Sequence, residues 1–303
     1  MMWRTWREAF HDLRRGPILD ELGHAVHRSR LWSIGGGLDS SLLRRMDEDV
    51  LIDPDLLMGA VEDRAAPLFL NHYSALGLRY ALTRYGLWER LAARAGGTPH
   101  VDIAGVGQAV QTMRILNRPD GEALVELSAG LTSAAAVDAP LPAMEHRWLS
   151  VEWLCLQDPT RSFSEGRPPL PGQKHPGLGE GREVIELLLI MGWRLGCAGL
   201  FGRPAWFHNA VMYRIHFRFL DPQEEGRMRG LLRAWRASGL GLGDFSRAVD
   251  GGRLQSEAGE PVKWTPGVVV APLLAEAEFQ DDAWEAAAKE SGETRYRVVP
   301  AES

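Results

Sequence analysis

The segments VEWLCLQDP (151–159) and KHPGLGEG (174–181) flank a loop rich in proline and glycine, and a long apolar stretch follows them. The first segment predicts a β-strand, and the stretch from 182 to 195 predicts a helix that is covered on most of its sides. Glycines before a helix start let a ligand approach backbone N–H groups, where the helix carries a partial positive charge. The order of strand, glycine loop and helix therefore predicts a site for an anionic group such as phosphate.

The loop is locally basic, although the chain as a whole is acidic. Its charged residues are Arg161, Glu165, Arg167, Lys174, Glu180 and Arg182. The formal net charge of −6 and the isoelectric point near 5.9 argue against a nucleic-acid partner, which would require a broad basic face. We therefore expect the positive charge of the loop to serve a small anionic ligand.

No apolar run reaches the roughly 18 residues that span a bilayer, and the charged start MMWRTWREAF lacks the apolar centre of a secretory signal. We expect a cytoplasmic protein with no membrane partner. Cys155 and Cys197 are too few for a disulfide framework or a thiolate metal site. His24 and His27 stand three residues apart, but no further ligands lie near them in sequence, so we expect no bound metal.

The chain of 303 residues is long enough for one large domain or two smaller ones. Helix-like apolar periods over 1–97, interrupted by proline and glycine, predict a helical N-terminal region. A strand-rich unit is expected over 98–275, with a hairpin turn at Pro-Asp-Gly (119–121). The remaining expectations are a helical insertion at 222–258, a closing strand at 261–273 and a peripheral tail with one helix at 276–303.

Residues 174–179 (KHPGLG) resemble the (Gln/Arg)-x-x-Gly-x-(Gly/Ala) loop of GNAT-type N-acetyltransferases, which holds the pyrophosphate of acetyl-CoA at a helix start. The segments that follow are similar as well. The strand-like AGLFG (198–202) precedes Asn209, Tyr213 and Phe217, which match a short helix of the family that reads roughly Asn, Tyr and Gly-Phe.

The resemblance covers residues 98–272, and this sequence departs from the family's pattern at several positions. Lys174 stands in place of Arg or Gln, and Pro176 removes one backbone donor from the loop. Glu180 would repel a phosphate, and His216 stands where the family usually has Gly.

The resemblance implies an α/β (α+β) fold, with a mixed and mostly antiparallel GNAT-like sheet that is flanked by helices. It implies transfer of an acetyl or other acyl group from acyl-CoA to an amine on a small molecule or a peptide. The two substrates would meet in a split between neighbouring strands, where a backbone N–H would stabilise the tetrahedral oxyanion. The residues expected to hold acetyl-CoA are Leu156, Gln157, Lys174, Gly177, Leu178, Gly179, Gly181, Arg182 and Asn209.

Acyl transfer needs a general acid for the departing thiolate and a base for the amine proton. The resemblance makes Tyr213 the candidate acid. Glu152, Asp158 and His175 are candidate bases by position alone. Structural roles remain open for three of them: Tyr213 also suits a core aromatic, Asp158 a turn before proline, and His175 an exposed loop.

A second glycine-rich segment, GGGLDSS (35–41), resembles the Ser-Gly-Gly-x-Asp-Ser loop of the PP-loop ATP pyrophosphatases. That resemblance implies an ATP-dependent adenylating enzyme in which RSRLWSI (28–34) forms the strand before the loop. Gly36, Asp39 and Ser40 would then line a pyrophosphate site. The alternative is a glycine turn in which Asp39 or Ser40 caps the next helix. A further hypothesis is a non-catalytic binding or regulatory module on a GNAT-like scaffold.

Overall fold

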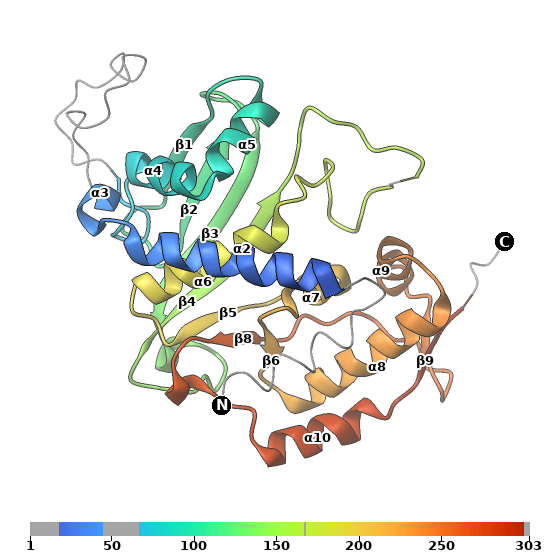
Figure 1. Ribbon diagram of the computed structural model, residues 1–303. Coiled ribbons are helices and arrows are strands. Elements are labelled where there is room, and N and C mark those ends of the chain that lie inside the picture. The colour runs from blue at the N-terminus through green and yellow to red at the C-terminus, as the bar shows by residue number, and fades with distance from the viewer. Residues whose placement is uncertain (1–17, 45–66, 167, 300–303) are drawn as a thin grey trace.

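The computed structural model describes residues 18–44, 67–166 and 168–299, and it contains a seven-stranded sheet with helices packed against it (Figure 1). In spatial order the strands are β1 (His100–Ala104), β2 (Gln111–Leu116), β3 (Ala123–Ser133), β4 (Arg147–Leu156), β5 (Gly199–Gly202), β8 (Val269–Pro272) and β6 (Arg218–Phe219). Neighbouring strands are antiparallel except β4 and β5, which run parallel. The expected α/β (α+β) class with a mixed, mostly antiparallel sheet is confirmed.

Strands β2 and β3 form the hairpin that the Pro-Asp-Gly turn predicts. Asp120 adopts a left-handed conformation (φ 56°), and the Gly121 N–H donates to the Arg118 carbonyl oxygen at 3.0 Å. Alternate residues of β2 are buried, so one face of the hairpin packs on the core. The five residues of β1 are too few to show such alternation, and the sequence pattern does not predict this strand.

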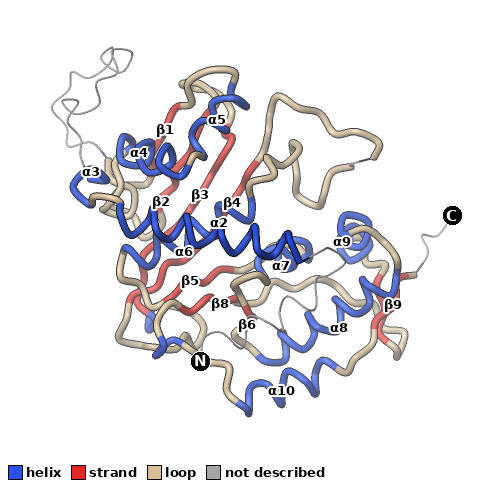
Figure 2. Tube along the Cα trace, in the orientation of Figure 1, coloured by secondary structure: helices blue, strands red, loops and turns tan. Residues whose placement is uncertain are grey.

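The helices precede, interrupt and follow the strands along the chain (Figure 2). They are α2 (Ile18–Gly37), α3 (Ser40–Arg44), α4 (Ala75–Tyr85), α5 (Leu87–Ala95), α6 (Gly181–Arg194), α7 (Phe207–Tyr213), α8 (Pro222–Ser238), α9 (Leu242–Asp250) and α10 (Asp282–Gly292), with 3₁₀ turns η2 (Ala134–Ala136) and η3 (Ala275–Ala277). None of these described helices combines the length and the apolar character needed to cross a bilayer. Helices expected before residue 18 and over 45–66 lie outside the described residues.

The described N-terminal region is helical, as expected, but the strand proposed at 28–34 is wrong because these residues lie inside α2. Gly35 belongs to the last turn of the same helix, where a side-chain carbon would lie 2.5 Å from Ile190 Cγ2 of α6. Glycine at this position lets α2 approach α6 closely. Asp39 Oδ1 accepts a hydrogen bond from the Ser41 N–H at 2.7 Å, so the alternative of a capped helix start is confirmed at α3.

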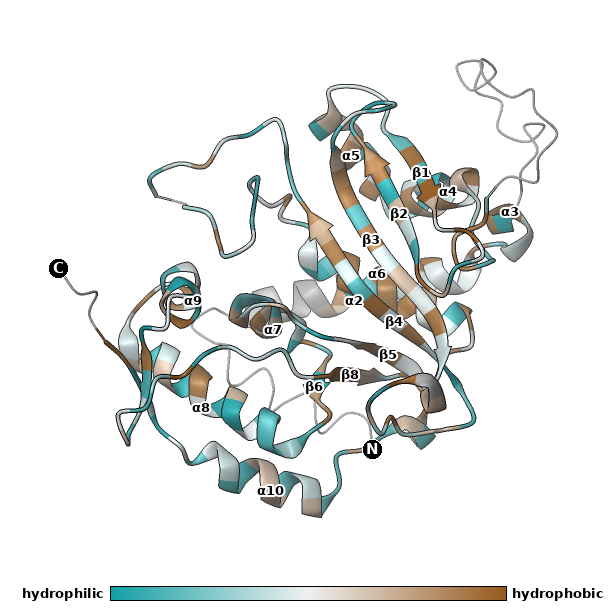
Figure 3. Cartoon of the chain, turned by 180° about the vertical axis from the view of Figure 1, so that it is seen from behind, coloured by the Kyte–Doolittle hydropathy of each residue, from teal (hydrophilic) through white to brown (hydrophobic). Residues whose placement is uncertain are grey.

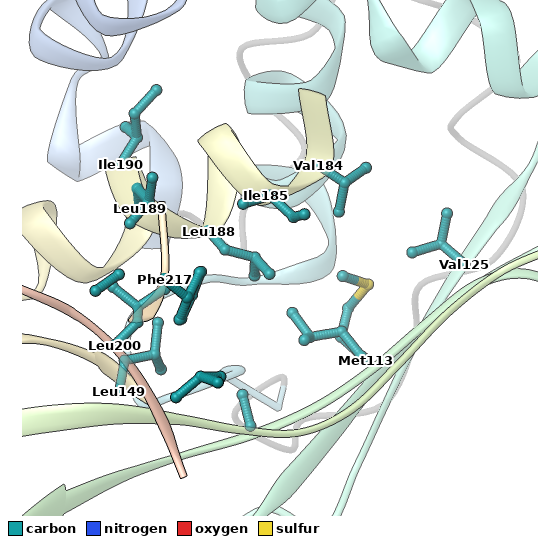
Figure 4. Packing of buried hydrophobic residues seen from close by; sticks show 14 of the residues in the cluster. Met113, Val125, Leu149, Val184, Ile185, Leu188, Leu189, Ile190, Leu200 and Phe217 are labelled. Carbon is teal, nitrogen blue, oxygen red and sulfur yellow. The ribbon is translucent and has the colours of Figure 1, made fainter. Parts of the chain in front are cut away.

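Helix α6 packs on one face of the sheet, whereas the view from behind shows the opposite face of β1 to β4 without a covering helix among the described residues (Figure 3). Val184, Ile185 and Leu188 of α6 belong to the same buried cluster as Met113 and Val125 of the sheet (Figure 4). On its other side α6 contacts α2. The prediction of a helix covered on most of its sides is therefore confirmed.

The C-terminal third packs around α8, whose buried residues share the main hydrophobic core with the sheet. Helices α8 and α9 form the expected insertion, and β8 is the expected closing strand between β5 and β6. Strands β7 (Leu254–Ser256) and β9 (Tyr296–Val298) pair as a two-stranded sheet. Helix α10 packs along α8, with Trp284 buried and its Nε1 donating to the Leu220 carbonyl oxygen at 2.9 Å. The segment after 276 is therefore integrated into the fold, contrary to the expectation of a peripheral tail.

Candidate functional site

The parallel pair β4 and β5 is joined over three residues only. Leu149, Ser150 and Val151 pair with Leu200, Phe201 and Gly202. Beyond these pairs β4 continues to Leu156 while β5 has ended, and the two chains diverge (Figure 3). On its other side β4 stays paired with β3 as far as Leu156. The last five residues of β4 therefore have one edge along which no strand of the described residues pairs.

A β-bulge lies where the divergence begins. Trp153 is opposite Ser128 and Val151 is opposite Ala129, so Glu152 has no residue opposite it on β3. Bulges bend a strand and redirect its side chains, and they are frequent beside functional sites. The bulge leaves Glu152 exposed at the end of the three-residue pairing with β5.

The open edge of β4 presents free backbone donors. The Gln157 N–H donates to the Leu124 carbonyl oxygen of β3 at 3.0 Å. Because N–H groups alternate in direction along a strand, those of Leu154 and Leu156 point away from β3, toward the side that β5 has left. Neither donates to another residue in the part of the chain that the structure describes. Leu156 thus offers the expected donor, whereas the Gln157 N–H is already occupied.

The glycine loop lies against the end of this edge. A side-chain carbon on Gly177 would lie 3.6 Å from the Leu156 carbonyl oxygen, and one on Gly181 would lie 3.9 Å from Leu156 Cδ1. Gly179 is exposed in a left-handed conformation (φ 86°), with nothing near its Cβ position. Leu178 is buried in the core between these glycines and anchors the loop. The loop is therefore fixed in place while its glycine backbone stays accessible.

Helix α6 begins at this loop with unsatisfied donors. Its first intrahelical bond runs from the Val184 N–H to the Glu180 carbonyl oxygen, and no described residue accepts from the N–H groups of Gly181, Arg182 or Glu183. Lys174 and the Arg182 side chain are exposed beside it. Such a helix start attracts an anion.

The acidic residues at this helix start contact two side chains from the N-terminal helices, Arg90 and His27. Arg90 of α5 donates to Glu180 Oε1 at 3.2 Å and to Glu183 Oε1 at 2.6 Å, and His27 of α2 lies 3.2 Å from Glu183 Oε2. Arg90 therefore offsets the repulsion that Glu180 would exert on a phosphate. Sequence reasoning missed Arg90, since nothing near it in the chain relates it to the glycine loop.

The segment between β4 and α6, residues 157–180, extends from the end of β4 toward α9 (Figure 3). The Asp158 N–H donates to the Pro176 carbonyl oxygen at 2.7 Å and closes the base of the loop. Farther out, Arg247 of α9 donates to the Pro169 carbonyl oxygen at 2.9 Å. Gly172 approaches the Trp206 ring so closely that any side-chain carbon would clash with it. Trp206 and Arg247 thus hold the segment between β4 and α6 in place. Sequence reasoning identified neither residue.

The candidate acid Tyr213 lies on α7 with Asn209, one turn apart, and α7 packs against α6. Burial raises the pKa of Tyr213, and the Asn209 amide opposes part of this shift. The Asn209 Oδ1 itself has no partner at hydrogen-bonding geometry among the described residues. Tyr213 also packs near Phe217, with ring centroids 5.9 Å apart. Its hydroxyl is therefore protonated at neutral pH, and the raised pKa makes it a weaker acid than an exposed tyrosine.

The three candidate bases differ in their surroundings. Asp158 is buried, accepts from the Thr160 hydroxyl at 2.6 Å and lies 3.5 Å from Arg94 Nη1, which is the environment of a structural turn carboxylate. His175 Nε2 lies 3.6 Å from the exposed Glu122 carboxylate. Glu152 is exposed at the bulge. Of the three, Glu152 is the one without a structural partner among the described residues.

The charge of Lys174 acts on Cys155, near the end of β4. Burial raises the pKa of the Cys155 thiol, the Glu126 carboxylate adds to the shift, and the Lys174 ammonium opposes it. Burial also raises the pKa of Cys197, to about 11. Both thiols are therefore protonated at neutral pH. The structure brings Leu156, Gly177 and Gly181 together at one end of β4.

Comparisons with known proteins do not assign this arrangement to a family. No protein-family model matches the chain, and no curated protein is similar to it at a significant level.

Proposed function

We propose that this chain is a GNAT-like acyltransferase that moves an acetyl or other acyl group from acyl-CoA to an amine. The observation that carries the proposal is the divergence of β4 from β5 after Val151, with the glycine loop and the α6 start placed at the far end of the free β4 edge. A strand edge and a helix start offer the two kinds of donor that CoA requires, for its amides and its phosphates.

The dimensions of the edge suit the co-substrate. From Val151 to Leu156 β4 advances five residues, roughly 16 Å at about 3.3 Å per residue. An extended pantetheine arm is of comparable length. With the pyrophosphate at Gly177, Gly179 and the α6 start, the arm follows the N–H groups of Leu156 and Leu154. The thioester then reaches the bulge at Glu152.

We assign the two proton transfers of the reaction to Glu152 at the bulge and to Tyr213 of α7. The amine nitrogen attacks the thioester carbon, the C–N bond forms and the C–S bond breaks. Glu152 takes the amine proton, directly or through a water molecule, and Tyr213 protonates the departing thiolate. A backbone N–H of the open β4 edge stabilises the oxyanion. The acceptor is a small-molecule or peptide amine that approaches from the bulge side of the divergence.

Thermal shift with three ligand conditions tests the proposal against its rivals. Acetyl-CoA should raise the melting temperature, because a ligand present at one hundred times its Kd adds about 2.7 kcal/mol of stability. No stabilisation by ATP with magnesium should depend on Gly36, Asp39 or Ser40, because the GGGLDSS segment ends one helix and caps the next. Stabilisation by ATP with magnesium that does depend on these three residues would favour the adenylating enzyme. Acetyl-CoA binding without release of free CoA in the presence of amines would favour the non-catalytic module.

A further inference from the structure

A hollow of about 480 Å³ opens beside α8 and the two-stranded sheet of β7 and β9. Helix α8 and strand β9 lie side by side there (Figure 1). Its polar lining consists of Arg227, Ser256, Lys263, Thr265, Thr294 and Tyr296. The hollow is shallow and wide open to solvent, so a ligand would bind there at the surface. No lining residue belongs to β4, the glycine loop or α6, so this hollow is separate from the proposed acyl-CoA site.

The charge that faces the hollow is positive. Arg227 comes from α8 and Lys263 from the segment before β8, and no carboxylate is among the described residues that line the hollow. The Lys263 ammonium makes no hydrogen bond or ion pair with any described residue. Glu224 precedes Arg227 by one turn, but forms no salt bridge with it among the described residues. Two cations therefore remain available to an incoming anion.

The backbone holds Arg227 in place, whereas no described residue bonds to the exposed Lys263 ammonium. Arg227 Nη2 donates to the Lys263 carbonyl oxygen, which fixes the guanidinium against the segment that carries the lysine. That segment is tied to β7, since the Val262 N–H donates to the Leu254 carbonyl oxygen at 2.8 Å. The Tyr296 ring is packed so closely on Gly230 that a side-chain carbon there would lie 2.7 Å from Tyr296 Cε2. The Arg227 guanidinium and the Tyr296 ring are thus both held in position where they line the hollow.

We propose that this hollow binds a phosphate group of a small molecule, with Arg227 and Lys263 as its cationic ligands. Ser256, Thr265 and Thr294 supply hydroxyl donors around it. Guanidinium, ammonium and hydroxyl groups together complement a tetrahedral oxyanion. The fixed Tyr296 ring offers a surface on which an aromatic group of the same ligand can stack.

Calorimetric titration of the full chain tests the proposal, with inorganic phosphate and adenosine 5′-monophosphate as probes at constant ionic strength. Because the glycine loop is also proposed to take phosphate, the titrations are run on the wild-type chain and on the Gly177→Asp variant. We expect saturable binding in both. Lys263→Gln should weaken it about tenfold or more, since it removes a charged hydrogen-bond partner. Lys289→Gln, the matched loss of an exposed lysine on α10, should leave it unchanged.

The two probes distinguish the sources of the phosphate. Tighter binding of the nucleotide would identify a phosphomonoester that stacks on Tyr296, and equal binding would identify the phosphate group alone as the ligand. The proposal is overturned if neither probe saturates the Gly177→Asp variant, or if Lys263→Gln and Lys289→Gln bind equally well.

Discussion

Glu186 of α6 and His216, in the turn after α7, meet in the core with Glu186 Oε1 2.7 Å from His216 Nε2. The distance is that of an ion pair, although the ring N–H is not aligned for a hydrogen bond. Both side chains are buried, and the second Glu186 oxygen accepts from Trp32 Nε1 of α2 at 3.3 Å. The Glu186 carboxylate therefore links α6 to α2 and to the turn that follows α7, the helix that carries Tyr213.

Removing one partner of this pair should be costly. His216→Ala leaves the Glu186 carboxylate buried without its partner on this side, and we expect a loss of about 3–5 kcal/mol in the free energy of unfolding. Urea denaturation measures this loss. Glu186→Gln combined with His216→Ala should cost less than the sum of the two single changes, because the pair is coupled. A single-variant loss below about 1 kcal/mol would show that the pair contributes little.

His208 predicts a pH dependence of stability. Burial lowers its pKa to about 4, partly opposed by Asp250, while its Nδ1 lies 2.9 Å from Ser246 Oγ. Between pH 6.5 and 4 the unfolded chain binds a proton there that the folded chain does not. The free energy of unfolding should therefore fall as pH drops through this window, by on the order of 1 kcal/mol per pH unit.

The test of this dependence is denaturation at pH 7, 6 and 5 for two histidine variants. His208→Gln should lose part of the pH dependence that the wild-type chain shows. His100→Gln removes an exposed histidine of β1 and should keep it. Equal slopes in the two variants would mean that His208 titrates normally.

Tyr213→Phe should separate chemistry from binding. Removal of the proton donor is expected to lower kcat by about 10²-fold to 10⁴-fold, while the Kd for acyl-CoA stays the same. The partly buried Tyr80 of α4 provides the matched control, since Tyr80→Phe also removes a hydroxyl. Release of free CoA thiol measures turnover. Full activity in Tyr213→Phe would show that Tyr213 is a core aromatic residue and not the proton donor.

Arg90→Gln should weaken acyl-CoA binding indirectly, through the Glu180 and Glu183 charges at the α6 start. Without Arg90 the Glu180 and Glu183 charges at the α6 start are no longer offset, and we expect about a twofold to fivefold rise in Kd. Arg84→Gln removes an equal charge from the exposed end of α4 and should not change the Kd. The effect of Arg90→Gln should shrink at high salt, because exposed charges are screened. An equal Kd for acyl-CoA in the two variants would show that Arg90 does not contribute to binding at the α6 start.

The elements that the sequence predicts correctly are those with a local signal. The Pro-Asp-Gly turn predicts the β2–β3 hairpin, and the apolar stretch after Gly181 predicts α6. The GGGLDSS segment misleads, because its first glycine serves contact with Ile190, 155 residues away in the chain (190 minus 35). A motif alone does not distinguish glycine for a ligand from glycine for a neighbouring helix.

The candidate site was predictable only in part. The glycines and Leu156 are adjacent in a strand, loop and helix order that the sequence displays. Arg90, Trp206 and Arg247 come from other elements, and they reach the loop only through tertiary packing. The bulge at Glu152 likewise depends on the register of β3 with β4, which residue types do not reveal.

Calorimetric titration with acetyl-CoA of two glycine variants tests the central claim most directly. Gly177→Asp adds a carboxylate beside the free β4 edge, where a side-chain carbon has ordinary contacts at 3.6 Å and 3.9 Å, so the fold should persist. Gly166→Asp adds the same charge to the same loop at a position with nothing near it. We predict saturable binding to the wild-type chain and to Gly166→Asp, and binding at least about tenfold weaker to Gly177→Asp. No binding to the wild-type chain, or equal binding to both variants, would contradict the account.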